Sequence, residues 1–162
     1  TKATKFKLEK KEIDLALLVS EVVSEAEPVS KNKNVMVRVV HRGQVLILGD
    51  RKILKLAVAN LINNSIRYSP NGTVDISLEK SNSLVSLVIR DNGMGIPVED
   101  EPYIFERFYR GKNAILAEPN GSGVGLFIVR KVAEIHNGNV SISRNSDGPG
   151  VTSRLTLPLM TE

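Results

Sequence analysis

The hydrophobic residues of this chain change their spacing along its length, and each spacing predicts one type of secondary structure. Some segments carry apolar side chains three or four positions apart, as on one face of a helix, whereas others alternate apolar and polar residues, as strands do. The expected helices cover residues 14–27, 50–69 and 126–136. The expected strands cover residues 35–40, 45–48, 73–79, 84–90, 140–144 and 151–157.

Turn residues divide these segments. Pro28 is expected to end the first helix, because a proline inside a helix removes a backbone donor and clashes with the preceding turn. Residues 80–83 and 146–150 are polar or rich in glycine and predict hairpin turns. Residues 97–121 show no clear element, and long loops of that kind are often lids. We predict one α/β domain over residues 1–162, a two-layer sandwich whose mixed, mostly antiparallel sheet is covered on one face by about three helices.

Composition narrows the class of protein. The 41% hydrophobic residues include 4% aromatic and no Trp, which predicts an aliphatic core. The net charge of +4 is mild, and no ladder of aromatic residues accompanies the lysines near the start, so we expect no nucleic-acid surface. The chain has no Cys, which excludes disulfides and fits a reducing cytosol. It has no apolar run long enough to span a membrane, and because it begins with Thr we expect a piece of a longer protein.

Asp91 closes the strand predicted at residues 84–90 and is followed by Gly93 and Gly95. A strand holds such a carboxylate rigidly at its end, and glycines let the backbone approach a ligand where a Cβ would clash. The carboxylate is suited to accept a hydrogen bond from the exocyclic amine of adenine. The alternative is an ordinary Asp-Asn-Gly turn.

A polar stripe runs along the helix predicted at residues 50–69. Asn60, Asn64, Arg67 and Tyr68 are spaced so that they lie on one side of this helix, beside its apolar face. Asparagine is a poor helix former, and the simple interpretation is that the amides face solvent. The more specific interpretation is that an amide oxygen binds Mg²⁺, that Arg67 neutralises phosphate charge and that Tyr68 lies along the base.

A glycine run precedes the last predicted helix. Gly123 and Gly125 open this helix, whose first backbone N–H groups have no partner within it and can face phosphate oxygens. On its own such a run is weak evidence for a phosphate site.

Four motifs in order resemble those of sensor histidine kinases. Residues 60–68 (NLINNSIRY) resemble the N box, and residues 91–95 (DNGMG) resemble the first glycine box. Residues 104–110 (IFERFYR) resemble the F box, and residues 121–126 (GSGVGL) resemble the second glycine box. The resemblance covers about residues 5–158 and implies the catalytic ATP-binding domain of the GHKL superfamily, with the Bergerat fold.

The resemblance implies roles for individual residues. Asn64 is the expected Mg²⁺ ligand, Asn60 supports the metal or the phosphates, and Asp91 binds adenine. By the same resemblance, residues 1–12 are expected to be a linker from an upstream dimerisation hairpin, and residues 97–121 are expected to form the ATP lid. The chain has Arg67 where the family commonly has Lys, and Ser65 where it has Ala. The full expected nucleotide-binding set is Asn60, Asn64, Arg67, Tyr68, Asp91, Gly93, Gly95, Ile96, Gly121, Ser122, Gly123, Val124, Gly125 and Leu126.

The predicted lid is aromatic and basic. Phe105, Phe108 and Tyr109 lie beside Arg107 and Arg110. The aromatic side chains could simply pack a short helix on the core, or anchor a hinge while one arginine moves onto the γ-phosphate. Phosphoryl transfer needs mainly positioning and charge neutralisation. The expected catalytic residues are therefore Asn60, Arg67, Arg107 and Arg110.

Two absences concern the reaction. Related GHKL ATPases carry a water-activating Glu where this chain has Asn60, so the resemblance favours transfer to another nucleophile over hydrolysis. His41 and His136 are expected to be structural or surface residues, which leaves the phosphoacceptor outside this chain.

We therefore predict that this chain is the catalytic domain of a sensor histidine kinase and that it lies in the cytoplasm. The parent protein is a candidate for anchorage in the inner membrane. The expected cofactors are ATP and Mg²⁺. The expected partners are the dimerisation hairpin of the same kinase and a response-regulator receiver domain, with no membrane contact by this domain. The alternatives are a non-catalytic ATP-binding or interaction module and another GHKL ATPase or protein kinase.

Overall fold

The computed structural model describes residues 7–41, 43–117, 123 and 125–160. Its main sheet has five strands, which are mixed but mostly antiparallel, as predicted. In spatial order the strands are β2 (Met36–Val40), β4 (Thr73–Ser81), β5 (Leu84–Asp91), β7 (Val151–Pro158) and β6 (Asn139–Arg144). Of the four neighbouring pairs in this sheet, only β2 with β4 is parallel.

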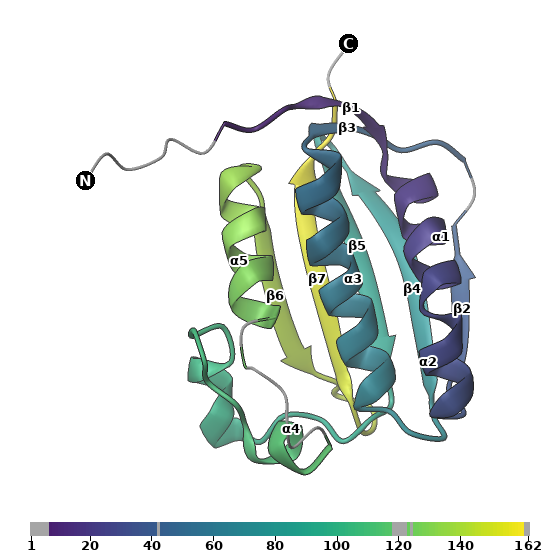
Figure 1. Cartoon of the computed structure of the whole chain (residues 1–162), viewed down its shortest axis with the longest axis vertical. Helices are drawn as coiled ribbons and strands as arrows, with labels where there is room; N and C mark the ends of the chain where they lie inside the picture. The colour runs from purple at the N-terminus through teal and green to yellow at the C-terminus, as the bar shows by residue number, and fades with distance from the viewer. Residues whose placement is uncertain (1–6, 42, 118–122, 124, 161–162) are drawn as a thin grey trace.

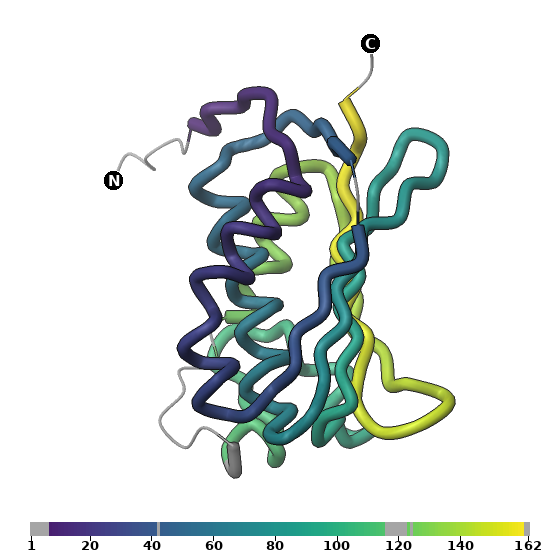
Figure 2. The backbone as a smooth tube through the Cα atoms, turned by 90° about the vertical axis from the view of Figure 1, so that its right-hand side faces the viewer, coloured from purple at the N-terminus to yellow at the C-terminus, as the bar shows by residue number. Residues whose placement is uncertain are grey.

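A layer of helices covers one face of this sheet (Figure 1). Its longer helices are α1 (Leu15–Glu25), α3 (Arg51–Arg67) and α5 (Gly125–Ile135), and this layer confirms the predicted sandwich. Figure 2 shows the two layers edge-on, with the other face of the sheet left open. Among the described residues, no helix has the length and apolarity needed to cross a bilayer.

The alternation of side chains along the strands explains the layering. In β4, Val74 and Ile76 are buried against the helices, as are Leu87 and Ile89 in β5. Burying each such side chain contributes about 1.5–3 kcal/mol. The intervening residues face the open side, where pairs such as Arg38 with Asp75 (2.6 Å) join neighbouring strands.

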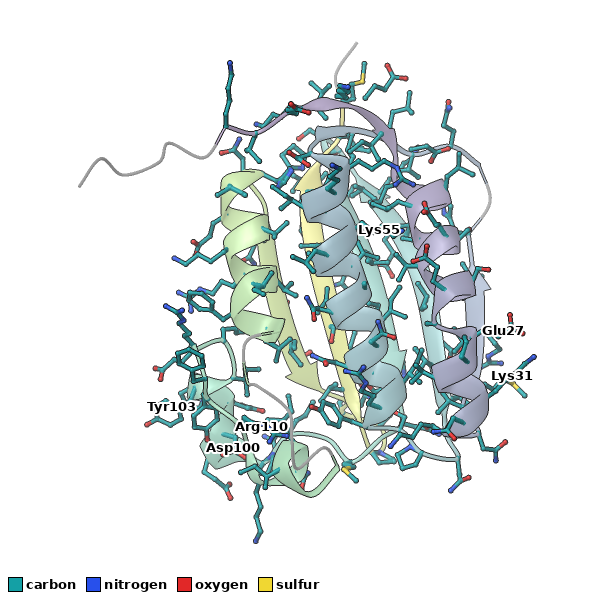
Figure 3. All side chains as sticks on the ribbon, in the orientation of Figure 1. Glu27, Lys31, Lys55, Asp100, Tyr103 and Arg110 are labelled. Atoms are coloured by element: carbon teal, nitrogen blue, oxygen red, sulfur yellow. The ribbon has the colours of Figure 1, made fainter. Side chains whose placement is uncertain are left out.

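Helix α3 lies at the centre of the helical layer. Asp50 caps it as predicted, because its Oδ1 accepts the backbone N–H of Ile53 at 3.4 Å. One face, including Leu54, Ala57 and Leu61, is fully buried. On another side, Lys55 reaches two glutamates of α1, and this lysine is labelled in Figure 3.

The first predicted helix is divided in two. The expectation that it continues to residue 27 and ends before Pro28 is wrong, because α1 ends at Glu25 and a second helix, α2 (Glu27–Asn32), follows. Pro28 lies in the first turn of α2. A proline is accommodated there, since the first N–H groups of a helix have no partner within it.

One short strand, its pairing and two short helices were not predicted. A separate two-stranded sheet pairs β1 (Lys11–Asp14) with β3 (Leu46–Gly49), so β1 begins inside the stretch predicted as a linker. The predicted lid region contains a 3₁₀ helix, η1 (Val98–Tyr103), and α4 (Lys112–Ala117). These short elements have no repeating apolar pattern long enough to identify them in the sequence.

Candidate nucleotide-binding site

A cavity of about 450 Å³ opens between α3, the start of α5 and the segment from β5 to α4. Most of the predicted site residues line it, although they come from distant parts of the sequence. Gly93 and Arg107 are not among the lining residues, and Gly121, Ser122 and Val124 lie outside the described residues. The predicted residues that line it are Asn60, Asn64, Arg67, Tyr68, Asp91, Gly95, Ile96, Arg110, Gly123, Gly125 and Leu126.

Asp91 contributes a buried carboxylate to this cavity, with 4% of its surface exposed. Its Oδ1 accepts the backbone N–H groups of Gly93 and Val151, each at 3.1 Å. Burial raises the pKa of Asp91, and these backbone hydrogen bonds, with the hydroxyls of Ser65 and Ser69, oppose that rise. The carboxylate is thus fixed in place in the wall of the cavity.

Gly93 does not line the cavity but allows the loop after β5 to pack closely against the end of α3. A Cβ on Gly93 would lie 2.2 Å from the carbonyl oxygen of Tyr68, and that carbonyl accepts the N–H of Met94 at 3.0 Å. Only a glycine permits this approach. Gly93 therefore brings the loop after β5 against the end of α3.

The two predicted amides lie on the wall formed by α3. The Nδ2 of Asn60 donates to the carbonyl of Leu56 at 3.0 Å, which fixes the orientation of the amide. The Oδ1 of Asn60 faces the start of α5, because a Cβ built on Gly125 would lie only 3.1 Å from it and 4.0 Å from Nδ2 of Asn64. The glycine start of α5 and the amides of α3 thus meet at one point.

The end of α3 supplies two further lining residues. Arg67 is in the last turn of the helix and is exposed, whereas Tyr68 caps the helix and is half-buried. Both line the cavity beside Asn64, so the predicted polar stripe is continuous on the folded helix.

Asp100 forms hydrogen bonds that link η1 to the residues just before α4 and to the start of that helix. This role was not predicted from the sequence. Asp100 is 7% exposed, accepts a hydrogen bond from the Tyr109 hydroxyl and accepts the N–H of Lys112 at 3.3 Å. The hydrogen bond to Asp100 raises the pKa of Tyr109 to about 12. Figure 3 shows Asp100, Tyr103 and Arg110 grouped in this segment, at the lower end of α5.

Helix α4 is joined to the glycine motif that follows β5. The Nδ2 of Asn113 donates to the carbonyls of Met94 (3.2 Å) and Gly95 (3.1 Å). Asn113 lines the cavity and was also missed, because nothing in its local sequence indicates partners so far away.

The two predicted lid arginines differ in position. Arg110 lines the cavity, and its Nη2 donates to the carbonyl of Ala114 at 2.8 Å. Arg107 instead lies over the aromatic rings of Phe108 (4.8 Å) and Phe127 (5.9 Å). Of the aromatic residues, Phe105 packs against the core, whereas Phe108 is 63% exposed.

Neither histidine lies in the cavity. His41 follows β2, and its Nε2 is 3.1 Å from the carbonyl oxygen of Gly43. His136 is buried at the end of α5 and hydrogen-bonded to the backbone through both ring nitrogens, so its predicted structural role is confirmed. Among the residues with described positions, no group of three or more His, Cys, Asp or Glu is placed to hold a metal ion.

Comparisons with known proteins agree with this geometry. The family model described as "Histidine kinase-, DNA gyrase B-, and HSP90-like ATPase" matches residues 49–161. The sensor-like histidine kinase SenX3 of Mycobacterium tuberculosis is 37% identical over 152 residues, which are 93% of this chain and 37% of that protein. The chain thus spans about a third of the length of the curated relatives it matches.

Two solved structures share the fold over nearly their whole length. The mycobacterial sensor histidine kinase MprB is 27% identical, with a TM-score of 0.76 over 94% of this chain and 99% of that one. The ATP-binding domain of PrrB from Mycobacterium tuberculosis is 25% identical, with a TM-score of 0.73 and the same coverage, 94% and 99%.

Proposed function

This chain belongs to the family of histidine kinase-, DNA gyrase B- and HSP90-like ATPases, and from that premise we propose that it is the catalytic ATP-binding domain of a two-component sensor histidine kinase. Its reaction is the transfer of the γ-phosphoryl group of Mg-ATP to a histidine on a separate dimerisation hairpin. One observation carries the proposal: the buried carboxylate of Asp91, the amides of Asn60 and Asn64, and the glycine start of α5 surround a single cavity.

Residues at the two ends of the cavity hold the two ends of the nucleotide. Asp91 accepts a hydrogen bond from the adenine amine, and Tyr68 lies along the base. The first N–H groups of α5 face the phosphates, where the helix terminus favours negative charge. Arg67 and Arg110, which also line the cavity, neutralise further phosphate charge.

The residues on α3 fit a magnesium ion. The orientation of Asn60 leaves its amide oxygen toward the start of α5, and Gly125 leaves space there that a Cβ would narrow. Asn64, with support from Asn60, would hold the ion, since Mg²⁺ prefers oxygen ligands and is commonly shared with substrate phosphates. When bound, Mg²⁺ neutralises charge on the phosphate oxygens.

The transfer step makes one bond and breaks one. A ring nitrogen of the acceptor histidine attacks the γ-phosphorus, the bond from that phosphorus to the β–γ bridging oxygen breaks, and ADP leaves. The imidazole loses its proton to solvent as the phosphoramidate forms. This chain contributes position and positive charge, which are the main requirements of phosphoryl transfer. At residue 60 it carries an amide, which cannot act as a general base toward water.

The proposed partners follow from this reaction. They are the acceptor hairpin of the same kinase and, downstream, the receiver domain of a response regulator that takes the phosphoryl group. We place the domain in the cytoplasm, where ATP is available, and propose that it acts without contacting nucleic acid or the membrane.

The test is labelling in trans. The chain is incubated with Mg-ATP labelled at the γ-phosphate, first alone and then with dimerisation hairpins of related sensor kinases. For each hairpin, a variant whose acceptor histidine is replaced by alanine serves as the control. We expect negligible label on the chain itself and acid-labile label on the histidine of an accepting hairpin. If the chain binds ATP but labels none of the hairpins, a non-catalytic nucleotide-binding module becomes the better account.

A further inference from the structure

His136 is buried at the end of α5 opposite the nucleotide site, with 4% of its surface exposed. Its Nε2 accepts the backbone N–H of Asp50 at 3.0 Å, and its Nδ1 lies 2.8 Å from the carbonyl oxygen of Val132. A backbone N–H can only donate, so Nε2 carries no proton and Nδ1 donates to Val132. The ring is therefore a neutral imidazole in one tautomer, and both of its nitrogens are used.

The hydrogen bond to Asp50 joins the end of α5 to the beginning of α3, and the one to Val132 fixes the orientation of the ring on α5. Val132 belongs to α5, whereas Asp50 caps α3 and accepts the N–H of Ile53. A Cβ on Gly49 would lie 3.0 Å from Cδ2 of the ring, so the imidazole packs directly against the backbone before α3. Asp50 also accepts the N–H of Glu9 at 3.2 Å, and the segment before β1 therefore meets the same junction.

The junction and the nucleotide site lie at opposite ends of the same two helices. Helices α3 and α5 run side by side in opposite directions (Figure 1). From Asp50 to Asn60 the helix rises roughly 15 Å, and from Gly125 to His136 roughly 16 Å, at the usual rise per residue. The two helices are thus fixed to each other at one end and form the proposed phosphate site at the other.

Packing of the core and the hydrogen bonds of His136 constrain the two helices in different ways. Both helices contribute buried aliphatic side chains to the core, including Val129 and Ala133 of α5 and Leu54 and Ala57 of α3. Close packing of such side chains resists a shift along the axis, although the hydrophobic attraction itself has no preferred direction. Hydrogen bonds depend steeply on distance and angle, so those of His136 add a directional constraint at one end of the pair.

We propose that His136 is a positioning residue for the nucleotide site. Its imidazole sets the axial register of α5 against α3, and thereby sets how Gly125 faces Asn60 and Asn64. The inference rests on the proposed function only in taking the ligand to be ATP and the reaction to be phosphoryl transfer.

Three substitutions separate the two hydrogen bonds of the ring. In His136→Gln, the side-chain oxygen can reach the position of Nε2 and accept from Asp50. In His136→Asn, the shorter amide can donate to Val132 but does not reach Asp50. His136→Phe fills the space and removes both bonds. Val22→Ala truncates a buried side chain on α1, which carries neither hydrogen-bond partner of the ring, and controls for lost stability alone.

The first readout is the pair of amide resonances of Gly125 and Leu126 in the nucleotide-free chain, and the others are Mg-ATP affinity and transfer to a hairpin. We expect His136→Phe and His136→Asn to shift both resonances and to slow transfer by about 100-fold, with a smaller loss of affinity. His136→Gln should restore resonances and rate. Val22→Ala should lower the melting temperature and leave both resonances in place.

The proposal is overturned if His136→Phe keeps the parental resonances and Mg-ATP affinity while losing only stability. If that variant does not fold, equal behaviour of the Gln and Asn variants overturns it. If the resonances respond as expected but the parent chain labels no hairpin, the positioning role stands and the proposed kinase function fails.

Discussion

The carboxyl group of Asp91 is buried in the cavity, and its burial has a consequence for the ligand-free chain. Its pKa is raised above the ordinary value of 3.8, mainly by desolvation. Ionising this group therefore costs more in the folded than in the unfolded chain. Stability falls as pH rises from 3.8 through the raised pKa, which is the reverse of the usual behaviour of a carboxylate.

Asp91→Asn should therefore raise the melting temperature of the ligand-free chain at pH 7 while weakening Mg-ATP binding. An asparagine oxygen can still accept from Gly93 and Val151, but the amide offers adenine a donor in place of an acceptor. The gain in stability should shrink as the pH approaches 4. Thermal melts across this pH range provide the measurement, with Asp147→Asn as the control. The pKa of Asp147 is lowered by its hydrogen bond to Arg90, so that variant should gain nothing at pH 7.

Residues were predictable where their chemistry follows from position within one element. Asp91 ends a strand, and Asn60 and Asn64 are one helical turn apart, so sequence alone places each relative to its neighbours. Asp100 and Asn113 were missed because their roles depend on partners in other segments, such as the carbonyls of Met94 and Gly95. Gly93 was expected to face a ligand, but the structure places it against α3.

At the scale of elements, the start of α5 is a place where helix stability and ligand binding oppose each other. Gly125→Ala should stabilise the helix, because alanine is the better helix former, by less than about 1 kcal/mol so near its end. The new Cβ would crowd Asn60 Oδ1 at 3.1 Å, and we expect Mg-ATP affinity to fall by about tenfold, or about 1.4 kcal/mol.

Calorimetric titration and thermal melts of Gly125→Ala give both quantities. Gly148→Ala is the matched control, because nothing lies within 4 Å of a Cβ at that exposed turn. Unchanged affinity in Gly125→Ala would mean that the space beside Asn60 is not used by the ligand.

Elements with a clear apolar pattern were predicted, whereas β1, η1 and α4, which lack one, were not. Helix α3 was expected from its apolar spacing and its Asp50 cap, and both were found. Pro28 was taken to end a helix because proline disrupts helix interiors, but the same residue is compatible with a first helical turn, which is where it lies. Strand β1 pairs with β3, which is far away in the sequence, and no local pattern marks that pairing.

At the scale of the whole molecule, the sandwich could be predicted but the order of its strands could not. Alternation identifies a strand and its buried face, whereas the parallel pairing of β2 with β4 depends on how α3 crosses between them. The cavity arises from this topology, because it brings the end of β5 and the start of α5 to the same end of α3.

Ligand binding should be visible in the stability of the whole chain. A ligand that binds only the folded state stabilises it by about 2.7 kcal/mol at 100 times its Kd. We therefore expect Mg-ATP to raise the melting temperature, and Mg-GTP at equal concentration to raise it much less, since guanine carries a carbonyl where adenine has the amine. Equal shifts with the two nucleotides would argue against base recognition by Asp91.

The central claim is that the amides of α3 and the start of α5 together form a Mg-ATP site. The most direct measurement is a calorimetric titration of Mg-ATP into the chain and into two variants, Asn64→Ala and Asn63→Ala. Both remove the same group from α3, but only Asn64 lines the cavity. The account predicts that Asn64→Ala loses most of the affinity with little change in the melting temperature, while Asn63→Ala binds as the parent does. Parental affinity in Asn64→Ala, or an equal loss in both variants, would contradict it.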